Sequence, residues 1–117
     1  MELDNYQAAA RRTINPQSTL TFEQRLTSFA LGIAGEAGEV ADELKKVVFH
    51  EHPLDRAKLA DELGDVLWYI AALATTAGLS LDEIAQGNVA KLQRRYPQGF
   101  STADSLRRVD VNGEEIS

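Results

Sequence analysis

The most constraining feature of this sequence is an apolar residue at every third or fourth position from Leu26 to Val48. Residues at this spacing share one face of an α-helix, so the pattern predicts a helix of about six turns with one buried side. Thr21 and Gln24 form a capping-box signal at its start, and Pro53 excludes helix at the residue before it. The chain is therefore organised around one long amphipathic helix.

Three further segments have helical periodicity. The pattern is weak from Leu3 to Arg12 and stronger over residues 55–77, where Gly78 provides a left-handed stop. The last helix begins at a capping-box signal at Ser80 and stops before Pro97. Helices with short connections pack as antiparallel neighbours, so these patterns predict a bundle.

No segment alternates convincingly with a period of two residues, so no strand is predicted. The expected fold class is all-α, a helical bundle of four main helices per chain, with residues 1–100 forming the domain. Residues 101–117 are polar, and Asn112-Gly113 is a turn signal. We expect these residues to form an irregular C-terminal tail.

Composition excludes several classes of protein. The 117 residues include no Cys, which excludes a disulfide scaffold, a thiolate nucleophile and a thiolate zinc site. The formal net charge of -6 argues against a nucleic-acid partner, which needs a cationic surface. The N-terminus is acidic rather than basic, and the longest uncharged stretch, from Val66 to Leu81, is too short to span a membrane. We expect a cytoplasmic protein with no membrane partner.

The helix over residues 55–77 is uncharged on more than one side. Its core stripe centres on Leu63, Leu67 and Ile70. The uncharged residues on another side are Trp68, Ala72 and Thr75. Because a helix that is apolar all round is buried all round, this pattern predicts a homo-oligomer with this helix at the contact. A single exposed Trp on a monomer is the simpler alternative.

Two pairs of acidic residues occupy matching positions on neighbouring helices. Glu36 and Glu39 are three residues apart, as are Glu62 and Asp65, and both pairs lie on equivalent flanks of the apolar stripes. If the helices pack antiparallel, the four carboxylates converge and need protonation or a cation. Oxygen ligands without Cys or a suitably placed His favour Mg²⁺, with Mn²⁺ as a possible substitute.

A solvated surface is the usual explanation for a single helical Glu, and the duplicated spacing argues against it here. Each acid pair also encloses a glycine, Gly38 or Gly64, which costs a helix about 1 kcal/mol. The glycines leave room for a ligand or for close helix approach. Glu43 continues the first stripe and is a candidate additional or outer ligand.

The last helix carries polar and basic residues beside its apolar stripe. Asn88, Lys91 and Arg95 lie at positions i, i+3 and i+7. Taken alone, these residues fit two interpretations equally well. They are either long side chains that cover the edge of the core or a group of donors that binds phosphate groups.

In their order and spacing, these residues resemble the MazG-like all-α nucleoside triphosphate pyrophosphohydrolases. The matching segments are Glu36-x-x-Glu39, then after 22 residues Glu62-x-x-Asp65 within Asp61–Tyr69, and finally Asn88-x-x-Lys91-Leu92-x-x-Arg95-Tyr96-Pro97. The resemblance implies Mg²⁺-dependent hydrolysis of (deoxy)nucleoside triphosphates between the α and β phosphates, which yields a nucleoside monophosphate and pyrophosphate. It also implies a dimer, or a dimer of dimers, of helical bundles.

Under this hypothesis, Glu36, Glu39, Glu62 and Asp65 are both the catalytic residues and the metal ligands. A water held in the site attacks the α-phosphorus, and the substrate-binding residues of the last helix stabilise the departing pyrophosphate. The identity of the general base stays open. The base of the nucleotide is expected between the first two helices, near the residues Gln7, Phe22 and Phe29.

Two competing hypotheses belong to other classes. In a non-catalytic helical assembly protein the acids only balance neighbouring Lys and Arg side chains. A di-iron carboxylate oxidase ordinarily needs Glu-x-x-His on two helices, whereas residue 39 is Glu and residue 65 is Asp. The assembly protein is thus the main alternative.

Overall fold

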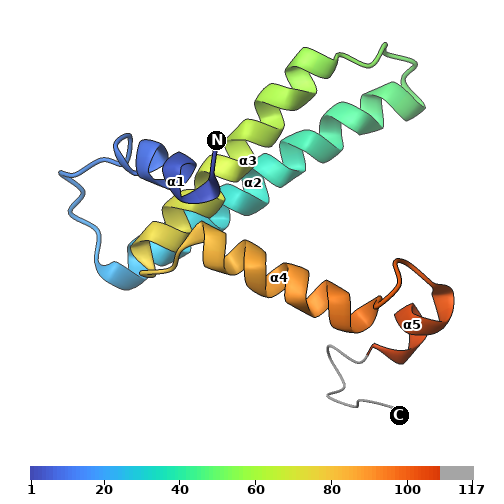
Figure 1. Cartoon of the computed structure of the whole chain (residues 1–117). Helices are drawn as coiled ribbons and strands as arrows, with labels where there is room; N and C mark the ends of the chain where they lie inside the picture. The colour runs from blue at the N-terminus through green and yellow to red at the C-terminus, as the bar shows by residue number, and fades with distance from the viewer. Residues whose placement is uncertain (109–117) are drawn as a thin grey trace. The chain divides into compact units, whose positions relative to one another are not determined.

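The computed structural model describes residues 1–108. Its helices are α1 (Leu3–Arg11), α2 (Phe22–Phe49), α3 (Arg56–Thr76), α4 (Leu81–Arg95) and α5 (Thr102–Arg107), as labelled in Figure 1. No strand forms among these residues, which confirms the predicted all-α class. The chain divides into one compact unit over Met1–Leu81 and a second that begins at Asp82, and each is described by itself. The expected single domain over residues 1–100 stays a prediction.

The start of α2 is fixed by the predicted capping box. The Thr21 hydroxyl accepts a hydrogen bond from the Gln24 backbone N–H at 3.1 Å, and the Gln24 side chain accepts one from the Thr21 N–H at 3.0 Å. The helix ends at Phe49, before Pro53, because Glu51 adopts a left-handed conformation with φ 57°. A backbone turn, rather than the proline itself, therefore ends α2.

Side-chain and backbone caps also fix both ends of α3. Asp55 accepts a hydrogen bond from the backbone N–H of Lys58 at 3.1 Å. At the other end Gly78 has φ 73°, and the N–H of Leu79 bonds to the Ala74 carbonyl at 2.8 Å. This is the Schellman arrangement, in which a left-handed glycine satisfies the last helical carbonyls.

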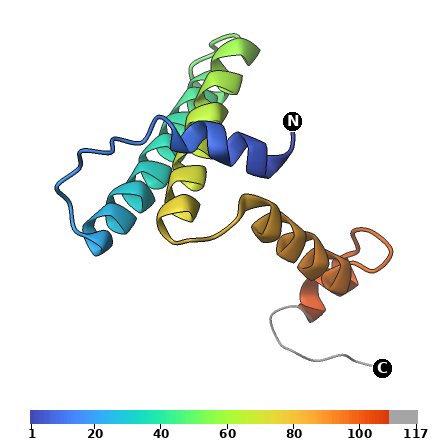
Figure 2. The ribbon, with the colours of Figure 1, turned by 60° about the vertical axis from the view of Figure 1, so that its left-hand side comes forward.

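Helices α2 and α3 lie side by side along most of their length, as Figures 1 and 2 show. Gly32 of α2 lies directly against the ring of Tyr69 on α3, and a Cβ atom at residue 32 would overlap that ring. Gly38 and Gly64 instead face open space. The close helix contact is therefore made at Gly32, which the sequence pattern did not indicate, and not at the two glycines beside the acids.

Helix α1 packs on α3 and covers one of its sides. The small core that they share consists of Ala10, Ala71, Ala74 and Leu81, with Tyr6, Trp68 and Ile70 against it. The Trp68 indole N–H donates to the Thr13 hydroxyl at 2.7 Å, and Ala72 is only 1% exposed. Trp68 is thus half-buried and Ala72 buried within the chain itself, and the oligomer contact predicted on this side of α3 stays a prediction.

The stripe of α3 expected to form the core is only partly covered. Leu63 is 51% exposed and Leu67 is 37% exposed. On α2, Leu44 and Val48 are exposed as well. Of the expected core stripe, Leu63 and Leu67 are therefore exposed, whereas Ile70 packs against the core that α1 and α3 form.

The second unit contains α4 and α5. Ser101 caps α5 by accepting a hydrogen bond from the Asp104 N–H at 3.0 Å. The expected irregular tail over residues 101–117 is therefore wrong for its first part, since a short, capped helix forms there. Residues 109–117, with the expected turn at Asn112-Gly113, lie outside the described residues.

Among residues 1–108, no single helix combines the length and apolar character needed to cross a membrane. Within the described part of the chain, α3 and α4 taken together across the bend between them meet the criterion by length and composition.

Candidate metal centre and adjoining pocket

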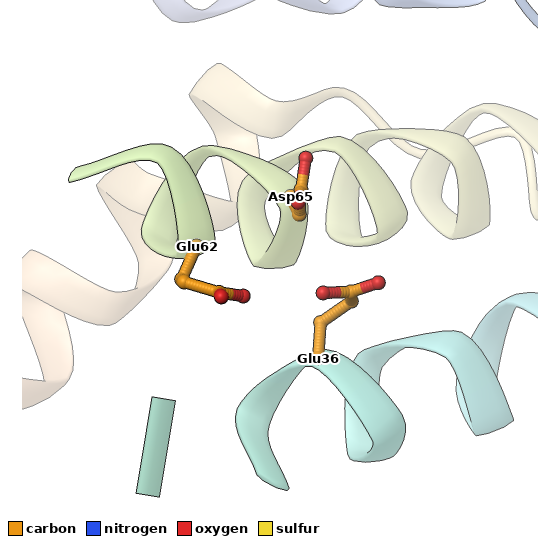
Figure 3. A group of neighbouring side chains, drawn as sticks. All are labelled: Glu36, Glu62 and Asp65. Carbon is orange, nitrogen blue, oxygen red and sulfur yellow. The ribbon is translucent and has the colours of Figure 1, made fainter. Parts of the chain in front are cut away.

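Three of the four predicted acids come together between α2 and α3. One carboxylate oxygen each from Glu36, Glu62 and Asp65 lies within 4.8 Å of the others. Figure 3 shows Glu36 extending from α2 toward α3, with Glu62 and Asp65 on α3. Glu36 and Glu62 are half-buried and Asp65 is exposed. The acidic spacing seen in the sequence thus produces one carboxylate group, which we call the acid cluster.

The environment of the acid cluster disfavours the charged form of Glu62. Partial burial raises the pKa of this carboxyl above its ordinary value, and the negative charges of Glu39, Glu36 and Asp65 raise it further, while Lys58 opposes them. Glu39 is exposed and lies outside the acid cluster, but its charge acts on Glu62. The fourth acid is therefore a neighbour of the cluster rather than a member of it.

Nearby cations pair with other acids. Lys58 of α3 forms an ion pair with Glu43 of α2 at 3.0 Å. Lys45 and Lys46 pair with Asp42 at 3.1 and 3.3 Å, on the exposed surface. Glu43, the expected additional or outer ligand, is thus engaged by a lysine, and the acid cluster keeps its excess negative charge.

The donor set of the acid cluster fits a hard divalent cation. Carboxylate oxygens are the ligands that Mg²⁺ and Mn²⁺ prefer, whereas zinc and copper select Cys or His. The cluster contains neither, and His50 and His52 contact each other instead, with ring centroids 6.3 Å apart. A cation among the three carboxylates would offset their repulsion, so Glu36, Glu62 and Asp65 suit a metal site.

Two cavities adjoin the acid cluster. One of about 400 Å³ is lined by Thr13, Glu36, Asp65, Trp68 and Tyr69. A second, of about 320 Å³, shares Thr13, Trp68 and Tyr69 with the first. Its other lining residues are Ile14, Asn15, Ser18, Leu20, Arg25, Ser28 and Phe29. We call this second cavity the aromatic pocket.

Hydrogen bonds and ring contacts hold the walls of the aromatic pocket in place. The Trp68 ring meets Tyr69 and Phe29 edge-on, with centroids 5.0 and 6.0 Å apart. Thr13 accepts the Trp68 N–H and donates its own hydroxyl to the Ala10 carbonyl at 2.7 Å. These contacts fix a set of flat apolar surfaces next to the acids, which suits a planar ligand with an anionic end.

The predicted base-recognition residues have different positions. Phe29 lines the aromatic pocket, but Phe22 is 48% exposed and lines neither cavity. The Gln7 side chain is used structurally, because it donates to the Leu79 carbonyl at 2.8 Å and accepts from the Leu81 N–H at 2.8 Å. Gln7 therefore secures the connection after α3, and its expected role in base recognition is not supported by its contacts.

The predicted substrate-binding residues lie on α4, in the second unit. Lys91 and Arg95 are half-buried and Asn88 is exposed. The Arg95 guanidinium lies 5.7 Å from the centre of the Tyr96 ring. Since the two units are described separately, the approach of these side chains to the acid cluster stays a prediction.

Sequence reasoning missed most of the aromatic pocket. The sequence pattern places Trp68 at an oligomer contact and does not distinguish Thr13, Asn15 or Arg25 from other loop and surface residues. The available signal was the Trp68-Tyr69 pair three residues after Asp65, which places aromatic rings one helical turn from a carboxylate.

Comparison with known proteins identifies the same family as the sequence motifs. The sequence matches the family model of the MazG nucleotide pyrophosphohydrolase domain over residues 24–100. The Gene 37 protein of Mycobacterium phage L5 is 37% identical over 105 residues, covering 85% of this chain and 92% of the phage protein. The dCTP pyrophosphatase 1 of Homo sapiens is 30% identical over 93 residues, and that of Bos taurus is 30% identical over 87.

These two alignments cover 74% and 69% of this chain. They cover only 55% and 52% of the mammalian proteins, so the chain spans about half their length. No solved structure matches the chain.

Proposed function

The chain belongs to the MazG nucleotide pyrophosphohydrolase family, and from this premise we propose that it hydrolyses nucleoside triphosphates between the α and β phosphates with Mg²⁺. The products are a nucleoside monophosphate and pyrophosphate. The observation that carries the proposal is the acid cluster beside the aromatic pocket, with Tyr69 and Trp68 lining both cavities. The acid cluster suits a cation and phosphates, and the aromatic pocket suits a flat base.

Glu36, Glu62 and Asp65 would hold the ion, and Glu39 lies next to them as a fourth acid. When bound, Mg²⁺ supplies positive charge that offsets the charge of the phosphates and favours deprotonation of water. A carboxylate of this group orients the attacking water and accepts its proton. The water oxygen bonds to the α-phosphorus, the bond to the bridging oxygen breaks, and pyrophosphate leaves.

Asn88, Lys91 and Arg95 act on the departing pyrophosphate in this proposal. Lys91 supplies a compact positive charge, Arg95 a planar fork of donors and Asn88 a directed amide. Support for this role comes from the family match, which extends through residue 100 and so includes all three.

For the substrate, dCTP is the first candidate. The mammalian relatives are described as dCTP pyrophosphatases, although the chain spans only half of their length. The aromatic pocket, at about 320 Å³, is of the size that accepts small planar ligands. We place the protein in the cytoplasm, where nucleoside triphosphates are abundant.

A homo-oligomer is the expected form of the enzyme. The exposed residues Leu63 and Leu67 of α3 and Leu44 and Val48 of α2 are large apolar side chains on the central helices. Burying them against a second copy removes apolar surface from water, at roughly 25 cal/mol per Å². Light scattering coupled to gel filtration should give a mass above 12.8 kDa for the wild type, and Leu63→Glu should lower that mass.

Measuring pyrophosphate release from dCTP, dGTP, dATP, dTTP and dUTP with Mg²⁺ tests the activity. Hydrolysis in ¹⁸O-labelled water should place the label in the nucleoside monophosphate, because attack is at the α-phosphorus. Label in pyrophosphate would place attack at the β-phosphorus and contradict the mechanism. Absence of turnover with every nucleotide would favour the alternative, a non-catalytic helical assembly protein.

A further inference from the structure

Arg25 of α2 lines the aromatic pocket, and part of its guanidinium has no protein partner. Within residues 1–108, its Nε atom is buried and makes no hydrogen bond. The same side chain lines a neighbouring cavity of about 350 Å³ together with Asn15, Ser18 and Thr76. A buried donor without an acceptor costs free energy, so its presence beside a cavity suggests that a ligand supplies the acceptor.

The position of Arg25 in its helix makes the missing partner more significant. Arg25 lies one turn after the N-cap Thr21, at the end of α2 where the helix dipole is positive. A cation is unfavourable there, and the ion pairs found among residues 1–108 do not involve Arg25. No ion pair among the described residues therefore accounts for an arginine at this position.

Distance along α2 indicates which part of a nucleotide Arg25 would meet. Arg25 precedes Glu36 by 11 residues, which places the two Cα atoms on nearly the same side of the helix and roughly 16 Å apart along its axis. If the phosphates are bound near the acid cluster, the base extends past Tyr69 and Trp68 toward Arg25. The guanidinium then faces the edge of the base rather than the phosphates.

We propose that Arg25 determines base specificity by donating two hydrogen bonds to a base with two adjacent acceptors. This inference rests on the proposed function of the same site. The guanidinium has donors only, arranged in a rigid fork. Cytosine offers O2 and N3 side by side, and guanine offers O6 and N7. Adenine places a donor amino group beside each of the acceptors N1 and N7, and uracil places an N–H between its carbonyls, so both fit the fork poorly.

The test compares Arg25→Gln and Arg25→Lys with the wild type on dCTP, dGTP, dATP and dUTP, at saturating Mg²⁺. Arg25→Gln should raise KM for dCTP or dGTP about ten-fold, the effect of losing one bidentate contact, and change KM for dATP and dUTP less than about two-fold. The kcat values should stay within about two-fold, since the contact is far from the reacting phosphorus. Arg56→Gln, at an exposed arginine of α3, is the matched control and should behave as the wild type.

A binding measurement separates this proposal from the proposed activity. Trp68 is the only Trp of the chain and lines the pocket, so its fluorescence reports ligand binding without turnover. Titrations with dCMP, dGMP, dAMP and 2-deoxyribose 5-phosphate should show that Arg25→Gln weakens dCMP or dGMP binding about ten-fold. Binding of the baseless sugar phosphate should be unchanged. This result can be obtained even if the wild type hydrolyses none of the triphosphates.

Three outcomes would overturn the proposal. Equal loss for every base, or loss for 2-deoxyribose 5-phosphate as well, would show that Arg25 contacts the phosphate or only maintains the fold. Unchanged selectivity in Arg25→Gln would show that the base does not reach it. If Arg25→Gln does not fold, judged by circular dichroism, Arg25→Lys keeps the stem and charge but not the fork, and it must still lower the preference for dCTP or dGTP over dATP by several-fold.

Discussion

The acid cluster and the aromatic pocket lie on the same pair of helices and have opposite electrostatic needs. Glu36, Glu62 and Asp65 bring negative charges within 4.8 Å of one another. In the pocket, Arg25 has a buried donor without an acceptor. A cation would offset the charges of the first region and an acceptor would satisfy the donor of the second, and a Mg²⁺–nucleotide complex would supply both. Under the proposed function, one elongated ligand would therefore satisfy both regions.

The largest expected effect comes from breaking the acid cluster. Asp65→Asn removes a negative ligand and should lower pyrophosphate release by at least about a hundred-fold, the scale of losing metal-assisted charge stabilisation. Asp61→Asn, at an exposed acid of the same helix, is the matched control. Normal turnover by Asp65→Asn, with unchanged helicity in both variants, would contradict the role of the cluster.

Removing positive charge from α4 should have the next largest effect. Lys91→Ala takes away a point charge expected at the departing pyrophosphate, so kcat/KM should fall about ten- to a hundred-fold. Steady-state kinetics with the preferred nucleotide measure this change. Lys45→Ala, which removes a surface lysine paired with Asp42, should leave kcat/KM within about two-fold. If both lysine variants behave alike, Lys91 does not act on the substrate.

Two glycine substitutions on α2 compare the close helix contact at residue 32 with the open space at residue 38. Gly32→Ala places a methyl group on the Tyr69 ring and should lower the free energy of unfolding by about 1–3 kcal/mol. Gly38→Ala enters open space near the acid cluster and should raise it by about 0.5–1 kcal/mol. Urea denaturation of both variants measures these changes. Equal effects would contradict the close contact of α2 with α3 at residue 32.

The smallest expected effect is a pH dependence that originates at Glu62. Since burial and neighbouring acids raise the pKa of its carboxyl in the folded chain, the folded state binds its proton more tightly than the unfolded state. In metal-free buffer, this contribution to stability should decline as pH rises through and beyond the ordinary glutamate value of 4.5.

Glu62→Gln lacks this titration and is the reference for that measurement. Its stability relative to the wild type should therefore increase with pH in metal-free buffer, and added Mg²⁺ should reverse the order at neutral pH. A stability difference that does not change with pH would show that the environment of Glu62 does not perturb its carboxyl.

The two regions also differ in how far the sequence predicts them. The acid cluster follows from spacing within two helices that pack side by side, so this spacing predicts Glu36, Glu62 and Asp65, together with Glu39, which lies outside the cluster. The pocket depends on how the segment after α1 folds back over Trp68, which places Thr13 and Asn15 beside Arg25. Hydrophobic periodicity does not predict how this segment folds back, because its loop residues contact partners that are far away in the sequence.

The ends of the helices can be predicted from the sequence, but the packing between the helices cannot. The ends of α2 and α3 agree with the caps read from Thr21 and Gly78, since caps are local interactions. Which residues of α3 are covered could not be predicted in the same way, because α1 packs on Ala71 and Ala74 while Leu63 stays 51% exposed. Hydrophobic periodicity indicates that a side is apolar, but not which neighbour covers it.

Anomalous X-ray scattering from a crystal grown with Mn²⁺ and a non-hydrolysable dCTP analogue tests the central claim most directly. The account predicts a manganese peak among the carboxylates of Glu36, Glu62 and Asp65, with the phosphates beside it and the base against Tyr69 and Trp68. Manganese bound elsewhere, with these carboxylates free of metal while the analogue is present, would contradict it.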